Sequence, residues 1–193
     1  MTLLSDPDRL ARLAERLSAM VGTEPDIQEV PPREPGDGEV FALVFADVPE
    51  PGFVTGVTYG LSPWQRANGQ PPARELCITM RSGDQAWARV PALAVAALRG
   101  FCPFSPGMVI GYMKPYVAGS GLSSLVLAGP APALALPEAI DLADSDATPE
   151  DLVRIVGAYP IHVSEREAIR FRGPATVWDS RWDPYDPARP AVV

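Results

Sequence analysis

Two stretches of the chain decide the fold: TYGLS at residues 58–62 and RELCITMR at residues 74–81. The second stretch alternates, because large apolar side chains occupy every second position from Leu76 to Met80, with Cys77 and Thr79 between them. This period of two, with β-branched residues and charged ends, predicts a strand that is buried on at least one face.

An extended run over residues 53–59 precedes Gly60 and predicts the neighbouring strand. The segment between the two strands contains prolines, which fix φ, and Asn68-Gly69, which accepts positive φ. We therefore expect two strands of one sheet, joined by a long exposed loop that carries Trp64.

Periodicity and helix start and stop signals predict the remaining elements. A first helix is expected to start at Pro7 after a cap at Ser5 or Asp6 and to end at Gly22. Further helices are expected over residues 91–99 and 164–172, and from Thr148 through the apolar run 152–156. Further strands are expected over residues 40–48, 108–113, 123–128, 140–142 and 175–178, with a short extended piece at 27–30. The helix over residues 91–99 is apolar nearly all round, so we expect it to be buried. The last helix opens with a capping box of Ser164 and Glu167.

These elements indicate the α+β fold class, with a mixed, largely antiparallel sheet flanked by about four helices. A single domain is expected over residues 1–193, with the N-terminal helix within residues 1–22 and an irregular Pro-rich tail over residues 179–193. The content of 47% hydrophobic and 21% charged residues is typical of a globular chain. The 23 prolines favour short elements and long loops over a helical bundle.

The charge and the chain ends indicate the class of partner and the compartment. A formal net charge of −8 repels phosphate backbones, so nucleic acid is excluded as a partner in favour of a basic or polar protein. The N-terminus has no basic region before a hydrophobic run, and no window is long enough to span a bilayer, so a soluble, cytoplasmic protein without a membrane partner is expected. Cys77 and Cys102 both lie in apolar contexts, which predicts reduced, buried thiols.

No set of residues forms a recognisable catalytic or metal-binding motif. His162 is the only histidine, and a triad with Cys77 or Cys102 would need a nucleophile on an exposed turn. A metal site from the same three residues lacks the short paired spacing of structural zinc sites. We therefore expect no catalytic residue, no cofactor and no metal. A hydrolase-type enzyme that uses Cys77 or His162 stays open as the alternative.

The order and spacing of several short landmarks resemble the suppressor of fused family. These landmarks are TYGLS at 58–62, Arg74-Glu75-Leu76 opening a strand, a buried helix before residues 106–110, Leu125–Leu127 followed by Pro130, Tyr159–Ile161, Glu165–Glu167 and a late arginine-bearing tail. The resemblance extends from about Gly52 to Arg189, and the chain is similar in size to bacterial single-domain members.

The resemblance implies a non-catalytic, protein-binding role. In the animal Hedgehog pathway, suppressor of fused grips a short peptide as an added strand between two domains. Bacterial single-domain members are associated with polymorphic toxin systems, where they are proposed to act as immunity proteins. For this chain, the resemblance therefore implies a protein or peptide partner, such as a toxin domain. A module of another pathway is the alternative within the same class.

We expect the partner to bind the segment from Gly60 to Arg74 and the adjoining sheet edge, since exposed aromatic loops beside a sheet suit the addition of a strand. The residues predicted to bind the partner are Tyr59, Trp64, Arg74 and Glu75.

Overall fold

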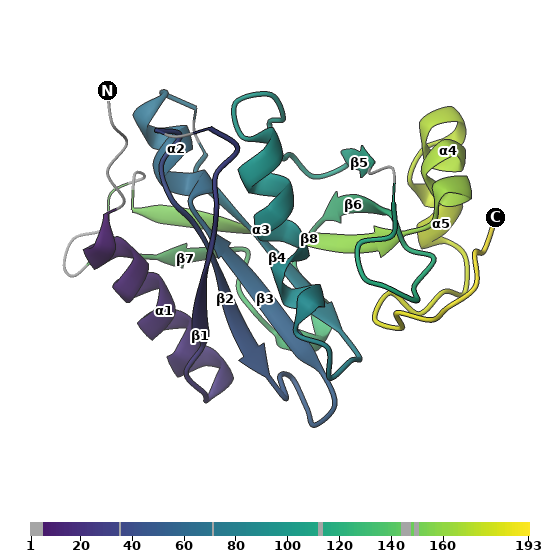
Figure 1. Ribbon diagram of the computed structural model, residues 1–193, viewed down its shortest axis with the longest axis horizontal. Coiled ribbons are helices and arrows are strands. Elements are labelled where there is room, and N and C mark those ends of the chain that lie inside the picture. Colours follow the sequence, from purple (N-terminus) through teal and green to yellow (C-terminus); the bar gives the residue numbers. More distant parts are fainter. Residues whose placement is uncertain (1–5, 35, 71, 112–113, 144–147, 149–150) are drawn as a thin grey trace.

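An eight-stranded sheet runs through the protein, in the order β1-β2-β3-β4-β8-β6-β5, with β7 also paired to β8 (Figure 1). The computed structural model describes residues 6–34, 36–70, 72–111, 114–143, 148 and 151–193. The strands are β1 Asp26–Val30, β2 Val40–Ala46, β3 Val54–Tyr59, β4 Arg74–Met80, β5 Val109–Gly111, β6 Ser124–Ala128, β7 Ala139–Asp141 and β8 Leu152–Ile161. β4 and β8 pair in parallel and the other pairs are antiparallel, which confirms the mixed, largely antiparallel α+β fold.

Five α-helices and one 3-10 turn accompany the sheet in the described residues. They are α1 Pro7–Val21, α2 Leu61–Ala67, α3 Ala86–Leu98, α4 Val163–Arg172, α5 Ala175–Trp178 and the turn η1 Pro132–Leu134. α1 begins as its sequence predicts, because the Asp6 side chain accepts a hydrogen bond from the Arg9 amide and Pro7 follows the cap. It ends at Gly22, which has a φ of 81°. None of the helices in these described ranges is long and apolar enough to cross a membrane.

The two faces of the sheet bury separate hydrophobic clusters. Leu76, Ile78 and Met80 of β4 pack in the cluster under α3, whereas Cys77 packs in the cluster under α1. The predicted alternation of β4 is therefore confirmed, with both faces of the strand covered. A third cluster lies under α4 and α5 at the other end of the sheet from α1 (Figure 1).

α3 packs unusually close to the sheet at Gly56 of β3. A Cβ atom placed on Gly56 would lie 2.1 Å from the carbonyl oxygen of Ala88. Because only glycine leaves room for this approach, Gly56 fixes how deeply α3 is seated on the sheet.

Residues 148–156 were predicted as a helix, but Leu152–Ile161 is strand β8, and Pro149 and Glu150 lie outside the described residues. β8 lies inside the sheet and is buried from Ile155 onward, so its apolar run lacks the alternation that marks a strand with one exposed face. Pro160 is tolerated because β4 pairs with β8 only as far as Gly157, beyond which β6 is the partner strand.

Two more elements differ in type from the prediction. Residues 175–178 were predicted as a strand and form helix α5, in which Val177 is fully buried. Trp178 packs edge-on against Tyr159, so tertiary packing overrides the strand propensity of this segment. The predicted exposed loop after Gly60 contains helix α2, whose Leu61 and Gln65 are buried.

Two helices begin earlier than predicted. α3 starts at Ala86, where the Asp84 carboxylate accepts the amide hydrogen bond, so Pro91 lies inside the helix and not at its first position. α4 is capped by a box of His162 and Glu165, so the predicted box of Ser164 and Glu167 was wrong. The remaining predicted strands are present with bounds that differ by one or two residues: most are shorter, β1 is one residue longer, and β7 is shifted by one residue. Residues 112–113 lie outside the described part of the chain.

Candidate functional site

The predicted TYGLS landmark is wrapped around the buried carboxylate of Glu75. Glu75 has no exposed surface and accepts four hydrogen bonds. The donors are the Thr58 hydroxyl at 2.5 Å, the Gly60 amide at 3.1 Å, and the Ser62 amide and hydroxyl at 2.9 and 2.7 Å. Since the Ser62 amide belongs to the first turn of α2, the β4 carboxylate caps a helix that precedes it in the chain.

Gly60 is held from its other side by Arg99, which follows α3. The Arg99 guanidinium donates to the Gly60 carbonyl at 2.8 Å and to the carbonyls of Asp37, Gly38 and Glu39. Gly60 has a φ of 131°, and a Cβ atom there would lie 2.7 Å from the Glu39 carbonyl oxygen. This position therefore requires glycine on grounds of both conformation and space.

Opposing effects act on the ionisation of Glu75. Burial raises the pKa of its carboxyl, whereas the hydrogen bonds from Thr58, Ser62 and Gly60 favour the charged form and oppose the rise. Tyr59 is also buried, and burial raises the pKa of its phenol, whose hydroxyl donates to the Asp6 carbonyl at 2.9 Å. Tyr59 and Glu75 thus position α1 and α2 from inside the protein.

Trp64 and Arg74 are half-exposed, so these two of the four predicted residues reach the surface. Trp64 lies on α2 next to Gly100, where a Cβ atom would be 3.5 Å from its ring. Arg74 opens β4 opposite the exposed Arg154 of β8, and its amide donates to the Gln65 side chain at 2.8 Å. Their contact with a partner stays a prediction.

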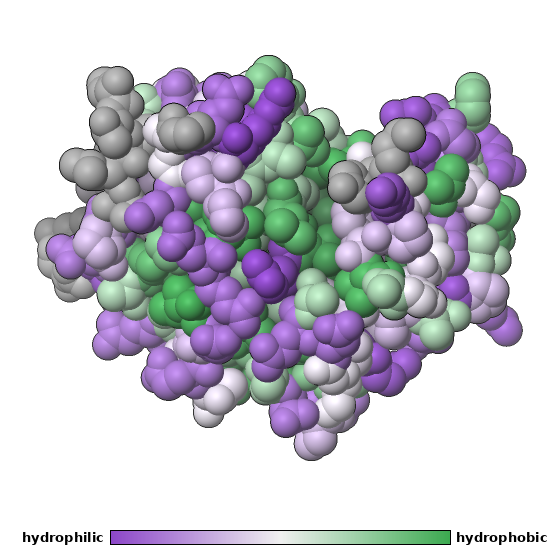
Figure 2. All heavy atoms as spheres, viewed as in Figure 1, coloured by the Kyte–Doolittle hydropathy of each residue, from purple (hydrophilic) through white to green (hydrophobic). Residues whose placement is uncertain are grey.

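An apolar groove separates α3 from β5. It has a volume of about 560 Å³, and its lining residues are Leu93, Ala94, Ala97 and Leu98 of α3, Ile110 and Gly111 of β5, and Lys114, Pro115 and Tyr116. Figure 2 shows apolar side chains gathered in the hollow between these two elements. Leu93 is 48% exposed, so the expectation that this helix is buried all round was wrong for the face that lines the groove.

One wall of the groove is an edge strand. β5 is the last strand in the sheet order and pairs only with β6 in the described residues. Arg166 of α4 supports it from the other face, because a Cβ atom on Gly111 would lie 2.2 Å from the guanidinium. An edge strand of this kind is where a further strand can add to a sheet.

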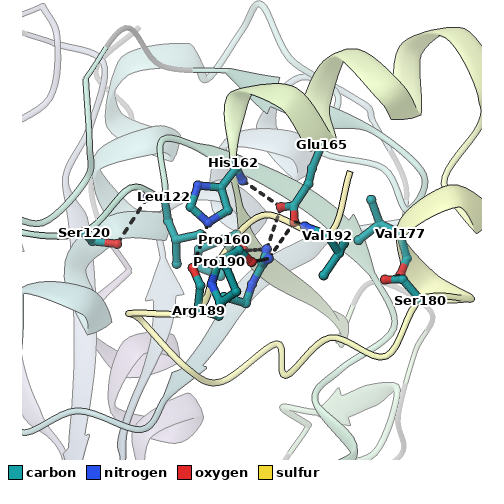
Figure 3. A network of polar contacts seen from close by, with 10 residues as sticks. All are labelled: Ser120, Leu122, Pro160, His162, Glu165, Val177, Ser180, Arg189, Pro190 and Val192. Atoms are coloured by element: carbon teal, nitrogen blue, oxygen red, sulfur yellow. Dashed lines mark hydrogen bonds and ion pairs between the residues drawn. The ribbon is translucent and has the colours of Figure 1, made fainter.

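Sequence reasoning also missed how firmly the C-terminal tail, residues 179–193, is bound. Arg189 donates to both oxygens of Glu165 at 2.6 Å, and the Val192 amide donates to the same carboxylate at 3.0 Å (Figure 3). Burial alone would raise the pKa of Glu165, but these donors and the His162 amide hold it below its usual range. The acidic residue three positions after His162 was the available signal for this network.

The hydrolase alternative would use Cys77, Cys102 or His162, and the structure shows the surroundings of all three. Cys77 is a buried free thiol, and burial raises its pKa to about 12. Cys102 is a half-buried free thiol whose pKa is also raised by burial. His162 caps α4, and its Nε2 contacts the Arg189 carbonyl at 2.9 Å. Among the described residues, no group of three or more His, Cys, Asp or Glu side chains could hold a metal ion.

The comparison with known families decides the assignment that the landmarks suggested. The family model described as Suppressor of fused protein (SUFU) matches residues 36–190. The chain belongs to this family. No curated protein matches the sequence.

Solved structures of suppressor of fused proteins have the same fold. A homologue from Neisseria gonorrhoeae is 16% identical with a TM-score of 0.64, over 97% of this chain and 96% of that one. A chain in the crystal structure of the Sufu-Fu complex is 15% identical to this chain with a TM-score of 0.59, over 88% of this chain and 82% of that one. Drosophila Suppressor of Fused is 16% identical with a TM-score of 0.54, and the match covers 84% of this chain but 44% of that one.

Proposed function

We propose that this protein binds a peptide segment of another protein in the groove between α3 and β5, without catalysing a reaction. The observation that carries the proposal is an exposed apolar groove lying beside the edge strand β5, whose outer side has no partner strand in the described residues. The family includes a protein crystallised in a Sufu-Fu complex, which supports a protein as the ligand.

The groove suits an extended segment that pairs with β5. Such a segment takes hydrogen bonds from the β5 backbone and places every second side chain into the groove. Ala94 and Ala97 leave room there, and Leu93 and Ile110 offer apolar surface. Each leucine-sized side chain buried in this way contributes about 1.5–3 kcal/mol before the cost of ordering the segment.

Trp64 extends this surface beyond the groove. It lies over Gly100, directly after the helix whose Leu98 lines the groove. In this proposal Trp64 and Arg74 contact the partner, whereas Tyr59 and Glu75 hold α2 in place. Loss of an aromatic anchor of a binding surface costs about 2 kcal/mol or more in binding.

The finer role that we propose is that of an immunity protein in a bacterial polymorphic toxin system, acting in the cytoplasm. Its support is the resemblance to bacterial single-domain members and the net charge of −8, which attracts a basic toxin domain. The arginine-dominated composition, with Lys114 as the single lysine, supports a bacterial origin.

The test compares three variants of the tagged protein in affinity purification from the source cells, followed by calorimetry with the recovered partner. Ala97→Arg places a charged side chain in the exposed groove and should weaken binding at least tenfold, and Trp64→Ala should weaken it about thirtyfold. Phe171→Ala, at an 85% exposed position on α4, is the matched control and should bind like wild type. Unchanged affinity of Ala97→Arg for the partner would refute the groove as the binding site.

The immunity role has its own test. Co-expression with the recovered partner should protect a growing culture if that partner is a toxin, and Ala97→Arg should lose the protection. A partner that binds the groove but has no effect on growth would instead support a module of another pathway.

A further inference from the structure

A second groove lies on the face of the sheet opposite to α3. It has a volume of about 420 Å³ and is formed where β6 and η1, β8, α5 and the C-terminal tail meet. Its aromatic lining residues are Tyr159, Trp178, Trp182 and Tyr185. Tyr159 points away from the α3 cluster and into the cluster under α4 and α5, so this groove is separate from the one between α3 and β5.

Three of these rings form a continuous row. The ring centroids of Tyr159 and Trp178 are 5.0 Å apart with planes at 90°, and those of Trp178 and Trp182 are 5.2 Å apart with planes at 62°. Successive edge-to-face packing turns each ring relative to the next, so the row offers ring faces and ring edges in alternation. Such an aromatic-lined groove accommodates the rigid pyrrolidine rings of proline.

The row is held in place from behind. The Arg189 guanidinium lies 4.5 Å from the centroid of Trp182 and is itself fixed by both oxygens of Glu165, as Figure 3 shows for the ion pair. At the other end, the Tyr159 hydroxyl donates to the Gly129 carbonyl at 2.8 Å. Because the rings are ordered before any ligand arrives, binding does not have to order them.

The side chains of Trp178 and Trp182 line the groove and make no hydrogen bond to the described residues. Both residues are half-buried, and neither indole N–H is among the fully buried donors, so each is open to an acceptor from outside the described part of the chain. A tryptophan side chain is a donor only, so its partner must be an acceptor. A polyproline II helix has no internal hydrogen bonds, and its carbonyl groups all face outward as free acceptors.

The charge of the lining selects an uncharged ligand. The described residues around the groove are aromatic side chains, the prolines Pro130, Pro132 and Pro184, and small residues, with no carboxylate among them. Aromatic rings also bind alkylammonium groups, but one face of Trp182 already carries the Arg189 guanidinium. That face of Trp182 is therefore closed to a second cation, and the lining residues offer no carboxylate that would attract one to the other rings.

We infer that this groove binds a proline-rich segment in the polyproline II conformation, with the indole N–H groups of Trp178 and Trp182 donating to its backbone carbonyls. The site is additional to the groove between α3 and β5, and neither proposal depends on the other.

Titration of the full chain with acetylated, amidated deca-L-proline tests the inference by NMR of the indole N–H signals. The Trp178 and Trp182 signals should shift with a common dissociation constant, whereas those of Trp64 and the buried Trp87 should not move. Nuclear Overhauser contacts between proline ring protons and the two shifted indoles are expected on the wild-type protein, which requires no variant.

Two variants and two other probes sharpen the test. Trp182→Phe keeps a ring but removes one N–H donor, and should weaken decaproline binding about fivefold, with Trp64→Phe as the unaffected control. Unmoved Trp178 and Trp182 signals at millimolar decaproline would overturn the inference. So would equal binding of a Gly-Ser decapeptide, or a response to tetramethylammonium in place of decaproline.

Discussion

Replacement of Glu75 by alanine removes the single acceptor around which the start of α2 is built. The amides of Gly60 and Ser62 and the hydroxyl of Thr58 are all buried, and all donate to this carboxylate. Each buried donor left without an acceptor costs about 1–3 kcal/mol. The two amides cannot rotate towards other acceptors, so they alone account for about 2–6 kcal/mol. We expect Glu75→Ala to lower the free energy of unfolding by about 4 kcal/mol.

The glutamine variant separates shape from charge. Glu75→Gln keeps the side-chain volume and one oxygen, which can still accept from Gly60 and Ser62. Its amide nitrogen replaces the oxygen that accepts from Thr58, so the buried Thr58 hydroxyl, whose oxygen accepts from the Leu76 amide at 2.9 Å, loses the acceptor for its own proton. One hydrogen bond is therefore lost, and we expect a cost of about 1 kcal/mol.

The contribution of Glu75 to the free energy of unfolding should depend on pH in a defined direction. Burial raises the pKa of Glu75 in the folded protein, so the folded state holds this proton at a pH where the unfolded chain has released it. The contribution of Glu75 to stability is fully present below its unfolded pKa of about 4.3 and decreases as the pH rises through the folded value. The stability difference between wild type and Glu75→Gln should narrow over the same range.

Urea unfolding at several pH values measures these differences, and hydrogen exchange of the amides in Leu61–Ala67 shows whether the effect is centred on α2. Glu138→Ala, at an exposed position, is the control and should change stability by less than about 0.5 kcal/mol. A loss below about 1 kcal/mol for Glu75→Ala, with an unchanged denaturant slope, would refute the role of the carboxylate as the centre of this network.

Three further predictions concern other parts of the fold. Arg189→Leu leaves the Glu165 carboxylate buried without its cation and should lower the free energy of unfolding by about 3–5 kcal/mol at pH 7. Because the pKa of Glu165 is lowered in the folded protein, this loss should shrink in urea titrations as the pH falls below about 4, and a loss that does not change with pH would contradict the prediction. Gly56→Ala should cost about 1–3 kcal/mol or more by thermal unfolding because α3 must move, with Gly83→Ala, which meets nothing within 4 Å, as the neutral control. Cys77 should react with a thiol reagent only after denaturation, since it is 1% exposed with a pKa of about 12, and rapid native labelling would restore the hydrolase alternative.

The parts of the fold that sequence predicted depend on local signals. The alternation of β4 from Leu76 to Met80 needs no knowledge of the partner strands, and Asp6, Pro7 and Gly22 mark both ends of α1 by themselves. The elements that sequence assigned wrongly depend on distant contacts. β8 is a strand because it lies between β4 and β6, and an apolar run of its length fits either a helix or a strand until those neighbours are known.

In the candidate site, too, the sequence predicted some features from local signals and missed those that depend on distant contacts. The sequence predicted that Tyr59 and Glu75 bind a partner, but it did not predict that both are buried, with Glu75 under the start of α2. The cap of that helix lies 13 residues later in the chain than Ser62, so no capping pattern near residue 61 could reveal it. Trp64 and Arg74 were predicted at the surface and are half-exposed there.

The groove between α3 and β5 follows from a mismatch between the width of the sheet and the width of one helix. α3 is seated against β2, β3 and β4, and Gly56 allows it to sit deeply there. The sheet continues beyond the helix through β8 and β6 to β5, so Ile110 lies past the helix on the same face. A helix that only covers the sheet would carry polar residues on its outer face, whereas α3 presents Leu93 and Ala97 to solvent on the side facing β5. Apolar residues on an exposed helix face cost solubility unless a partner covers them, so the composition of α3 is itself an argument for binding at this groove.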